Sequence, residues 1–102
     1  MSDLTIANTI LSQMGGTGRL SMMIGATGFV GSDNSVSFRF KARAKNGVNA
    51  FMVTLDPSDT YTIEFISVRG TSRKVKESLS MVYAEDLKSI FQNKTGLYLS
   101  LL

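Results

Sequence analysis

The chain has 102 residues, enough for one domain, and its 43% hydrophobic and 19% charged residues are typical of a globular protein. Histidine and cysteine are absent, which excludes thiol nucleophiles, disulfides, zinc fingers and histidine general bases. The net charge of +3 is too small by itself to imply a polyanionic partner. We find no signal-peptide pattern and no long apolar run, so we expect a cytoplasmic protein without a membrane segment.

The N-terminal segment has the spacing of an amphipathic helix. Apolar residues recur three and four positions apart at Leu4, Ala7, Ile10, Leu11 and Met14. The pair Gly15-Gly16 is expected to end this helix, because glycine adopts the left-handed C′ conformation without strain.

After Gly18 the apolar pattern changes to a period of two. Leu20, Met22 and Ile24 alternate with other residues, which predicts a strand. Glycines at positions 25, 28 and 31 then interrupt the pattern and predict a glycine-rich bulge or hairpin, followed by a turn at 32–34.

The clearest alternation covers Val36–Lys45, where every second residue is apolar. A strand there would have one apolar face and one face carrying four cations, namely Arg39, Lys41, Arg43 and Lys45. Along a strand these four would be about 6–7 Å apart, close to the phosphate spacing of an extended nucleic-acid strand. The pair Asn46-Gly47 predicts a tight turn after it.

Two further strands follow, the first at Ala50–Leu55 and the second starting near Tyr61. The Asp56-Pro57-Ser58-Asp59 segment between them has the chemistry of a β-turn. The inner face of the resulting antiparallel meander should bury Phe38, Phe40, Phe51, Val53, Leu55, Ile63 and Phe65.

The C-terminal part begins with a basic loop or strand extension that contains Arg69, Arg73, Lys74 and Lys76. The pattern leaves open whether 77–81 is strand or helix. A second helix follows, with Val82, Leu87, Ile90 and Phe91 on one face and Gly96 as its C-cap. The tail is strongly apolar and predicts packing on the core or a contact in a homo-oligomer or with a partner, through Leu97, Tyr98, Leu99, Leu101 and Leu102.

These elements predict a single α+β domain over residues 1–102. The expected order is α-β-β-β-β-α, with an antiparallel sheet of about four strands. Because one sheet face is expected to be basic, both helices should cover the other face, which gives two layers.

The segment Ile24–Ser32 resembles the glycine-rich turn of extended short-chain dehydrogenases and sugar-nucleotide epimerases. In that family the glycines let a cofactor pyrophosphate approach a helix N-terminus. Here a strand pattern follows in place of a helix, and no acidic residue is placed to hold a ribose. We therefore predict no cofactor. We also expect no metal site and no catalytic residues, because no carboxylate cluster or general base is recognisable.

The basic residues are the main functional signal of the sequence. Cations spaced along an extended backbone are typical of proteins that bind single-stranded nucleic acid without sequence preference. The alternative interpretation is a solvated sheet face whose charges are balanced by neighbours such as Glu64. The predicted nucleic-acid-binding residues are Arg39, Lys41, Arg43, Lys45, Arg69, Arg73, Lys74 and Lys76.

The segments Asn8–Gly16, Asp59–Tyr61, Val82–Leu87 and Thr95–Tyr98 resemble a group of small phage and mobile-element proteins. This resemblance implies a genomic setting, with the bacterial host cytoplasm as the compartment, and it implies no site residue. The order of the elements after residue 18 is also similar to the fold of transcriptional-coactivator and Whirly-type single-strand binders, an analogy of fold only. Two non-enzymatic functions follow as hypotheses: a module that binds single-stranded nucleic acid, and a phage inhibitor that docks on a host defence enzyme.

Overall fold

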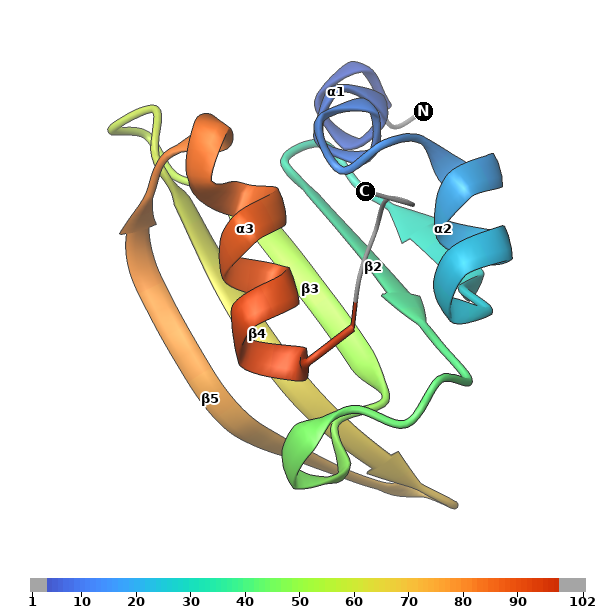
Figure 1. Cartoon of the computed structure of the whole chain (residues 1–102). Helices are drawn as coiled ribbons and strands as arrows, with labels where there is room; N and C mark the ends of the chain where they lie inside the picture. The colour runs from blue at the N-terminus through green and yellow to red at the C-terminus, as the bar shows by residue number, and fades with distance from the viewer. Residues whose placement is uncertain (1–3, 98–102) are drawn as a thin grey trace.

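Residues 4–97, which the computed structural model describes, form three helices and one five-stranded antiparallel sheet (Figure 1). The helices are α1 (Thr5–Gln13), α2 (Thr17–Ile24) and α3 (Ala84–Thr95). The strands are β1 (Thr27–Gly31), β2 (Ser35–Arg39), β3 (Ala50–Leu55), β4 (Tyr61–Arg69) and β5 (Ser72–Val82). A short 3₁₀ segment, η1, covers Lys45–Gly47.

Strands that follow one another in the chain are neighbours in the sheet, so the sheet is a simple meander in the order β1-β2-β3-β4-β5. All three helices contribute to the same hydrophobic core on one face of this sheet. The predicted α+β class and the two layers are therefore confirmed. The sheet has five strands where the sequence predicted about four, and there is one more helix than expected.

The first helix forms as its spacing predicts. Ala7, Ile10 and Leu11 are buried, and the helix ends before Gly15 and Gly16, which both have positive φ. The helix lies close to β1 at Gly31. A Cβ at Gly31 would come within 3.0 Å of the Ala7 Cβ, so the close approach of α1 to the sheet requires glycine at this position.

The strand predicted around residues 20–24 is wrong, because these residues belong to α2. Leu20 and Ile24 are four positions apart. Residues with this spacing lie on the same face in a helix and also in a strand, so the spacing does not distinguish the two. Met22 separates the two alternatives. Its side chain is 72% exposed, as a helix requires, whereas a strand would have buried it beside Leu20 and Ile24.

The glycine-rich segment forms a hairpin with a bulge, as predicted. Gly25 ends α2 in the left-handed conformation, and β1 then pairs with β2 with a register shift between Thr27 and Val30. The order of elements is thus helix, glycine, strand, which is the reverse of the strand, glycine, helix order that a dinucleotide-binding turn needs.

The strand expected at Val36–Lys45 is only half right, because β2 ends at Arg39. Beyond it the chain turns toward α2, where the backbone N–H groups of Lys41 and Ala42 both donate to the Ile24 carbonyl at 3.1 Å. The alternation of burial nevertheless continues. Phe40 is buried and Ala42 and Ala44 pack against the core, while the cations between them stay exposed.

The basic segment after β4 forms a hairpin, and residues 77–81 belong to the strand β5. β5 is an edge strand, because it pairs with β4 alone. Its pairing shifts register beside Lys76, since Ile66 pairs with Val75 and Phe65 pairs with Glu77. Lys76 therefore has no direct partner across the strands, which is the arrangement of a β-bulge.

The core is built on a cluster of phenylalanine rings. Phe91 of α3 lies against Phe51 and Phe65 of the sheet, with ring centroids 4.9 Å and 6.4 Å away, and against Phe40 just beyond β2, at 5.8 Å. Phe38 joins this cluster and connects it to Phe29 of β1. The predicted inner face is thereby confirmed, with Leu55 as a partly buried member.

Among the residues that the structure describes, no helix is both long and apolar enough to cross a lipid bilayer.

Candidate nucleic-acid interface

The eight predicted site cations lie at one end of the sheet. Four come from the segment that runs from the end of β2 to η1, and four come from the β4–β5 hairpin and the start of β5. In Figure 1 both segments are at the lower end of the molecule. We call this region the basic end, and its residues are Arg39, Lys41, Arg43, Lys45, Arg69, Arg73, Lys74 and Lys76.

Asn49 holds the two basic segments together. Its side-chain amide donates to the Val68 carbonyl at 2.8 Å, and its side-chain oxygen accepts from the Val68 N–H at 2.7 Å. Its own backbone N–H donates to the Ile66 carbonyl, and its carbonyl accepts from the Phe40 N–H. One residue thus fixes the end of β2, the loop before β3 and the last part of β4 in a single arrangement.

The turn at Asn46 and Gly47 lies between the two basic segments. Both residues have positive φ, 61° and 72°, as the predicted tight turn requires. A side chain built on Gly47 would come within 3.5 Å of the Arg69 guanidinium, so the turn lies against that side chain. Lys45, at the start of the turn, donates from Nζ to the Asn93 carbonyl near the end of α3.

The predicted stripe of four cations on one strand face is wrong. Arg39 is the last strand residue of the four, and Lys41, Arg43 and Lys45 follow in the loop and in η1. Arg73, on β5, faces the same side of the sheet as Arg39, and both line one hollow. Lys74 points to the other side, because neighbours on a strand alternate. The cations therefore surround the end of the sheet and do not form a line across its face.

Within the described part of the chain, the structure gives no salt bridge between a cation of the basic end and an acid. The salt bridge that the structure gives within residues 4–97 joins Lys94 to Glu77 at 2.7 Å, and neither residue belongs to the basic end. Glu64, the acid that was expected to balance the outer face, lies across from Met52 and Ser78 in the sheet. The interpretation of a balanced, solvated face is therefore not supported by any ion pair of the described residues.

Five of the seven acids in the described residues lie at the opposite end of the sheet. Asp33 lies between β1 and β2, Asp56 and Asp59 lie between β3 and β4, and Glu85 and Asp86 are in the first turn of α3. These segments are neighbours, since the Leu55 N–H donates to the Asn34 carbonyl at 2.7 Å and Val82 pairs with Tyr61.

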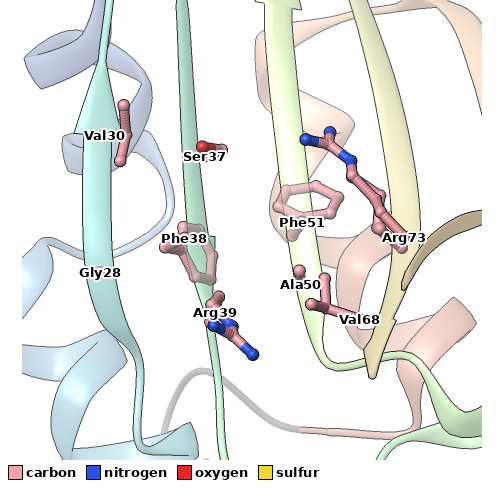
Figure 2. Close-up of a pocket in the computed structure, with 10 residues that line it drawn as sticks. Gly28, Val30, Ser37, Phe38, Arg39, Ala50, Phe51, Val68 and Arg73 are labelled. Atoms are coloured by element: carbon pink, nitrogen blue, oxygen red, sulfur yellow. The ribbon is translucent and has the colours of Figure 1, made fainter. Parts of the chain in front are cut away.

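Next to the basic end, the outer face of the sheet contains a shallow hollow of about 170 Å³ that is open to solvent. Figure 2 shows the side chains of Arg39 and Arg73 directed toward β3 from opposite sides. The floor between them is formed by Ala50, Ile66 and Val68. Ala50 and Ile66 are 7% and 2% exposed, although neither belongs to the main core on the other face.

Aromatic side chains are missing from this outer surface in the described part of the chain. All six phenylalanines belong to the core or pack against it, and Tyr61 is buried. Tyr83 is 54% exposed, but it precedes α3 at the acidic end. Within residues 4–97, an aromatic platform on which successive bases could stack is therefore absent from the basic end.

In the described chain, no three acidic side chains gather where they could hold a metal ion. The acids at the end opposite the cations have local structural roles, as Asp56 shows by accepting a hydrogen bond from the Thr62 hydroxyl at 2.6 Å.

The predicted interface in the tail is largely outside the described residues. Leu97 packs against the core and is partly buried, in line with one of the two expected roles of the tail. Tyr98, Leu99, Leu101 and Leu102 lie beyond the described range, so self-association through the tail stays a prediction.

Sequence reasoning missed Asn49 and the floor of the hollow. The role of Asn49 depends on a contact with Val68, 19 positions away, and no local pattern signals it. The floor had a visible signal, because Ile66 and Val68 continue the β4 pattern on the face opposite Phe65.

Comparisons of the chain with models of protein families, with curated proteins and with solved structures return no match. The resemblance to small phage and mobile-element proteins therefore stays a prediction.

Proposed function

We propose that this protein is a non-enzymatic module that binds single-stranded nucleic acid through its basic end, by contacts with phosphates and without reading the sequence. The observation that carries the proposal is the gathering of eight of the 11 cations at one end of the sheet, with no ion pair to a described acid. Unpaired cations held close together repel one another, which costs stability unless an anion neutralises them.

A phosphate backbone is the anion that fits best. It offers a series of charges at regular spacing, whereas a single small anion would meet only one or two of the cations. The cations come from a rigid frame, because Asn49 and the Asn46-Gly47 turn fix the two basic segments relative to each other. The lack of exposed aromatic rings in the described part of this end favours backbone contacts over stacking of successive bases.

The test is the salt dependence of binding to a labelled single strand, measured by fluorescence anisotropy. If four cations each neutralise one phosphate, the logarithm of the association constant should fall with the logarithm of the salt concentration with a slope of about −3. The variant Lys41→Ser/Arg43→Ser should reduce that slope by about 1.4 and keep the fold, since both residues are exposed.

A matched control removes the same charge elsewhere. Arg19 lies on α2 and Lys88 lies on α3, outside the basic end. The variant Arg19→Ser/Lys88→Ser should bind with the slope of the original protein. Absence of binding at about 50 mM salt, or equal losses in the two double variants, would refute the proposed interface.

The second candidate is a protein-binding module, which in the setting implied by the sequence resemblance is a phage inhibitor of a host defence enzyme. Two exposed apolar side chains on the outer sheet face favour it, Val30 at 64% and Val75 at 45% exposure. Salt separates the two functions, because an apolar protein interface weakens little with salt. A pull-down from host lysate with and without nuclease treatment tests the same distinction.

A further inference from the structure

We propose that the hollow between Arg39 and Arg73 holds one base of the bound strand, a pyrimidine-sized ring, while the rest of the basic end contacts phosphates. This inference rests on the proposed function and adds to it a specific place for a base. A base-binding hollow would make the protein prefer single strands over duplexes, and strands with bases over abasic strands.

The size and the lining of the hollow support a single ring. Its volume of about 170 Å³ is close to the ~150 Å³ of an engineered protein cavity that accepts one benzene ring. The floor is aliphatic, formed by Ala50, Ile66 and Val68, and of these three the half-buried Val68 offers the most surface to the face of a flat ring. A purine, with two fused rings, would extend beyond this floor.

The two arginines supply the contacts that the missing aromatic residues would otherwise make. A guanidinium is planar, and arginine is the cationic side chain that stacks on flat rings. Arg39 comes from β2 and Arg73 comes from β5, so the two groups reach the hollow from opposite sides (Figure 2). Among residues 4–97, the partner that the structure gives the Arg73 guanidinium is the Met52 sulfur at 3.8 Å, a weak acceptor that a ligand can replace.

The position of the hollow favours a base over an unrelated apolar group. Arg39 also lines the adjoining surface with Lys41 and Asn49, and Asn49 belongs to the frame of the basic end. A base in the hollow would therefore have its own phosphate next to cations. In a duplex the base is paired and stacked, and moving it out of the stack costs free energy. The protein should therefore bind single strands more tightly than duplexes.

The first test compares two labelled strands of equal length, about ten nucleotides, within the range that one small domain covers. One strand is oligothymidylate, and the other carries abasic sites at every position. The phosphate charge is the same in both strands. We expect oligothymidylate to bind about 3- to 10-fold more tightly, in line with a stacking contact to one or two guanidinium groups.

The second test keeps the charge and changes the shape of the cations. The variant Arg39→Lys/Arg73→Lys removes both planar groups from the hollow. The matched control is Arg43→Lys/Arg69→Lys, which makes the same chemical change at two exposed residues of the basic end that do not line the hollow. We expect the first variant to lose the preference for oligothymidylate over the abasic strand and the second to retain it, with the salt slope the same in both.

A third variant, Ala50→Leu, fills the floor of the hollow without changing any charge. It should reduce the preference for oligothymidylate while binding of the abasic strand stays the same, and a circular dichroism spectrum checks that the sheet is intact. Equal affinity for the two strands in the original protein, or equal effects of the two Arg→Lys pairs, would overturn the inference and leave the proposed function standing. Failure of both strands to bind at low salt would instead overturn the proposed function.

Discussion

The two ends of the sheet carry opposite charges, and those charges are used differently. At the acidic end, three of the acids have a local structural role. Asp56 accepts from the Thr62 hydroxyl within a turn, and Glu85 and Asp86 occupy the first turn of α3, where the helix dipole favours negative charge. At the basic end Lys45 donates to a helix carbonyl, and within residues 4–97 the structure gives the other cations there no side-chain hydrogen bond to a turn or a helix end.

This difference separates charges that the fold needs from charges that it does not need. Removing an acid should disturb a turn or a helix start and leave binding unchanged. Removing a cation of the basic end should leave the fold unchanged and weaken binding. The two ends therefore provide controls for each other, and five variants test the comparison in order of decreasing effect on stability.

The largest effect is expected in the core that both ends share. Phe51 is fully buried and its ring lies 4.9 Å from that of Phe91 and 5.1 Å from that of Phe65. Phe51→Ala should cost about 3–5 kcal/mol of unfolding free energy in a urea titration. Phe40→Ala should have a similar effect. A loss below ~1 kcal/mol for either would contradict the assignment of the inner face.

The next largest effect is expected at the basic end itself. Asn49→Ala leaves the N–H and the carbonyl of the half-buried Val68 without their partners, which should cost about 1–3 kcal/mol. Hydrogen exchange should accelerate at the Val68 amide and stay slow at Ile63, in the middle of β4. Uniform acceleration along β4 would show that Asn49 supports the whole domain and not this end alone.

A smaller effect is expected at the acidic end. Asp56→Ala removes the acceptor of the Thr62 hydroxyl and should cost about 0.5–1.5 kcal/mol. The affinity for a single strand and its salt slope should not weaken, because Asp56 is at the far end of β3. A parallel loss of binding would contradict the separation of the two ends.

The smallest effect on stability is expected where the effect on binding is large. Lys41→Ser/Arg43→Ser should change the unfolding free energy by less than about 0.5 kcal/mol, since both side chains are exposed and neither forms an ion pair with a described acid. Loss of like-charge repulsion acts in the stabilising direction. A destabilisation above ~1 kcal/mol in the same urea titration would show that these cations support the fold.

The sequence predicted which side chains point into the core better than it predicted which backbone groups pair. In Val36–Lys45 the alternation identified which residues are buried, and Phe40, Ala42 and Ala44 do pack inward. It could not show that the strand ends at Arg39, because the backbone of Lys41 and Ala42 bonds to Ile24, and an alternating pattern contains no information on hydrogen-bond partners. The position of the cations was wrong for this reason, although their exposure was right.

Short segments limited the prediction in the N-terminal half. Eight residues of α2 contain only two buried positions, Leu20 and Ile24, and a spacing of four fits a helix and a strand equally. The later strands had longer patterns and clear turns, so β3 and β4 were predicted correctly. The eight cations were predicted as one set, but their arrangement around the end of the sheet could not be predicted, since it depends on the long-range contact between Asn49 and Val68.

The lysines of β5 have a second consequence, for solubility. An edge strand presents unpaired backbone groups, and natural proteins protect such edges from adding strands of other molecules with lysines and bulges. β5 is an edge with Lys74 near one end of it and Lys76 at a bulge. Neutralising these two residues would remove that protection, and the resulting aggregates could be mistaken for altered binding. Lys41 and Arg43 lie off the edge, and substitutions there change the charge without inviting self-association.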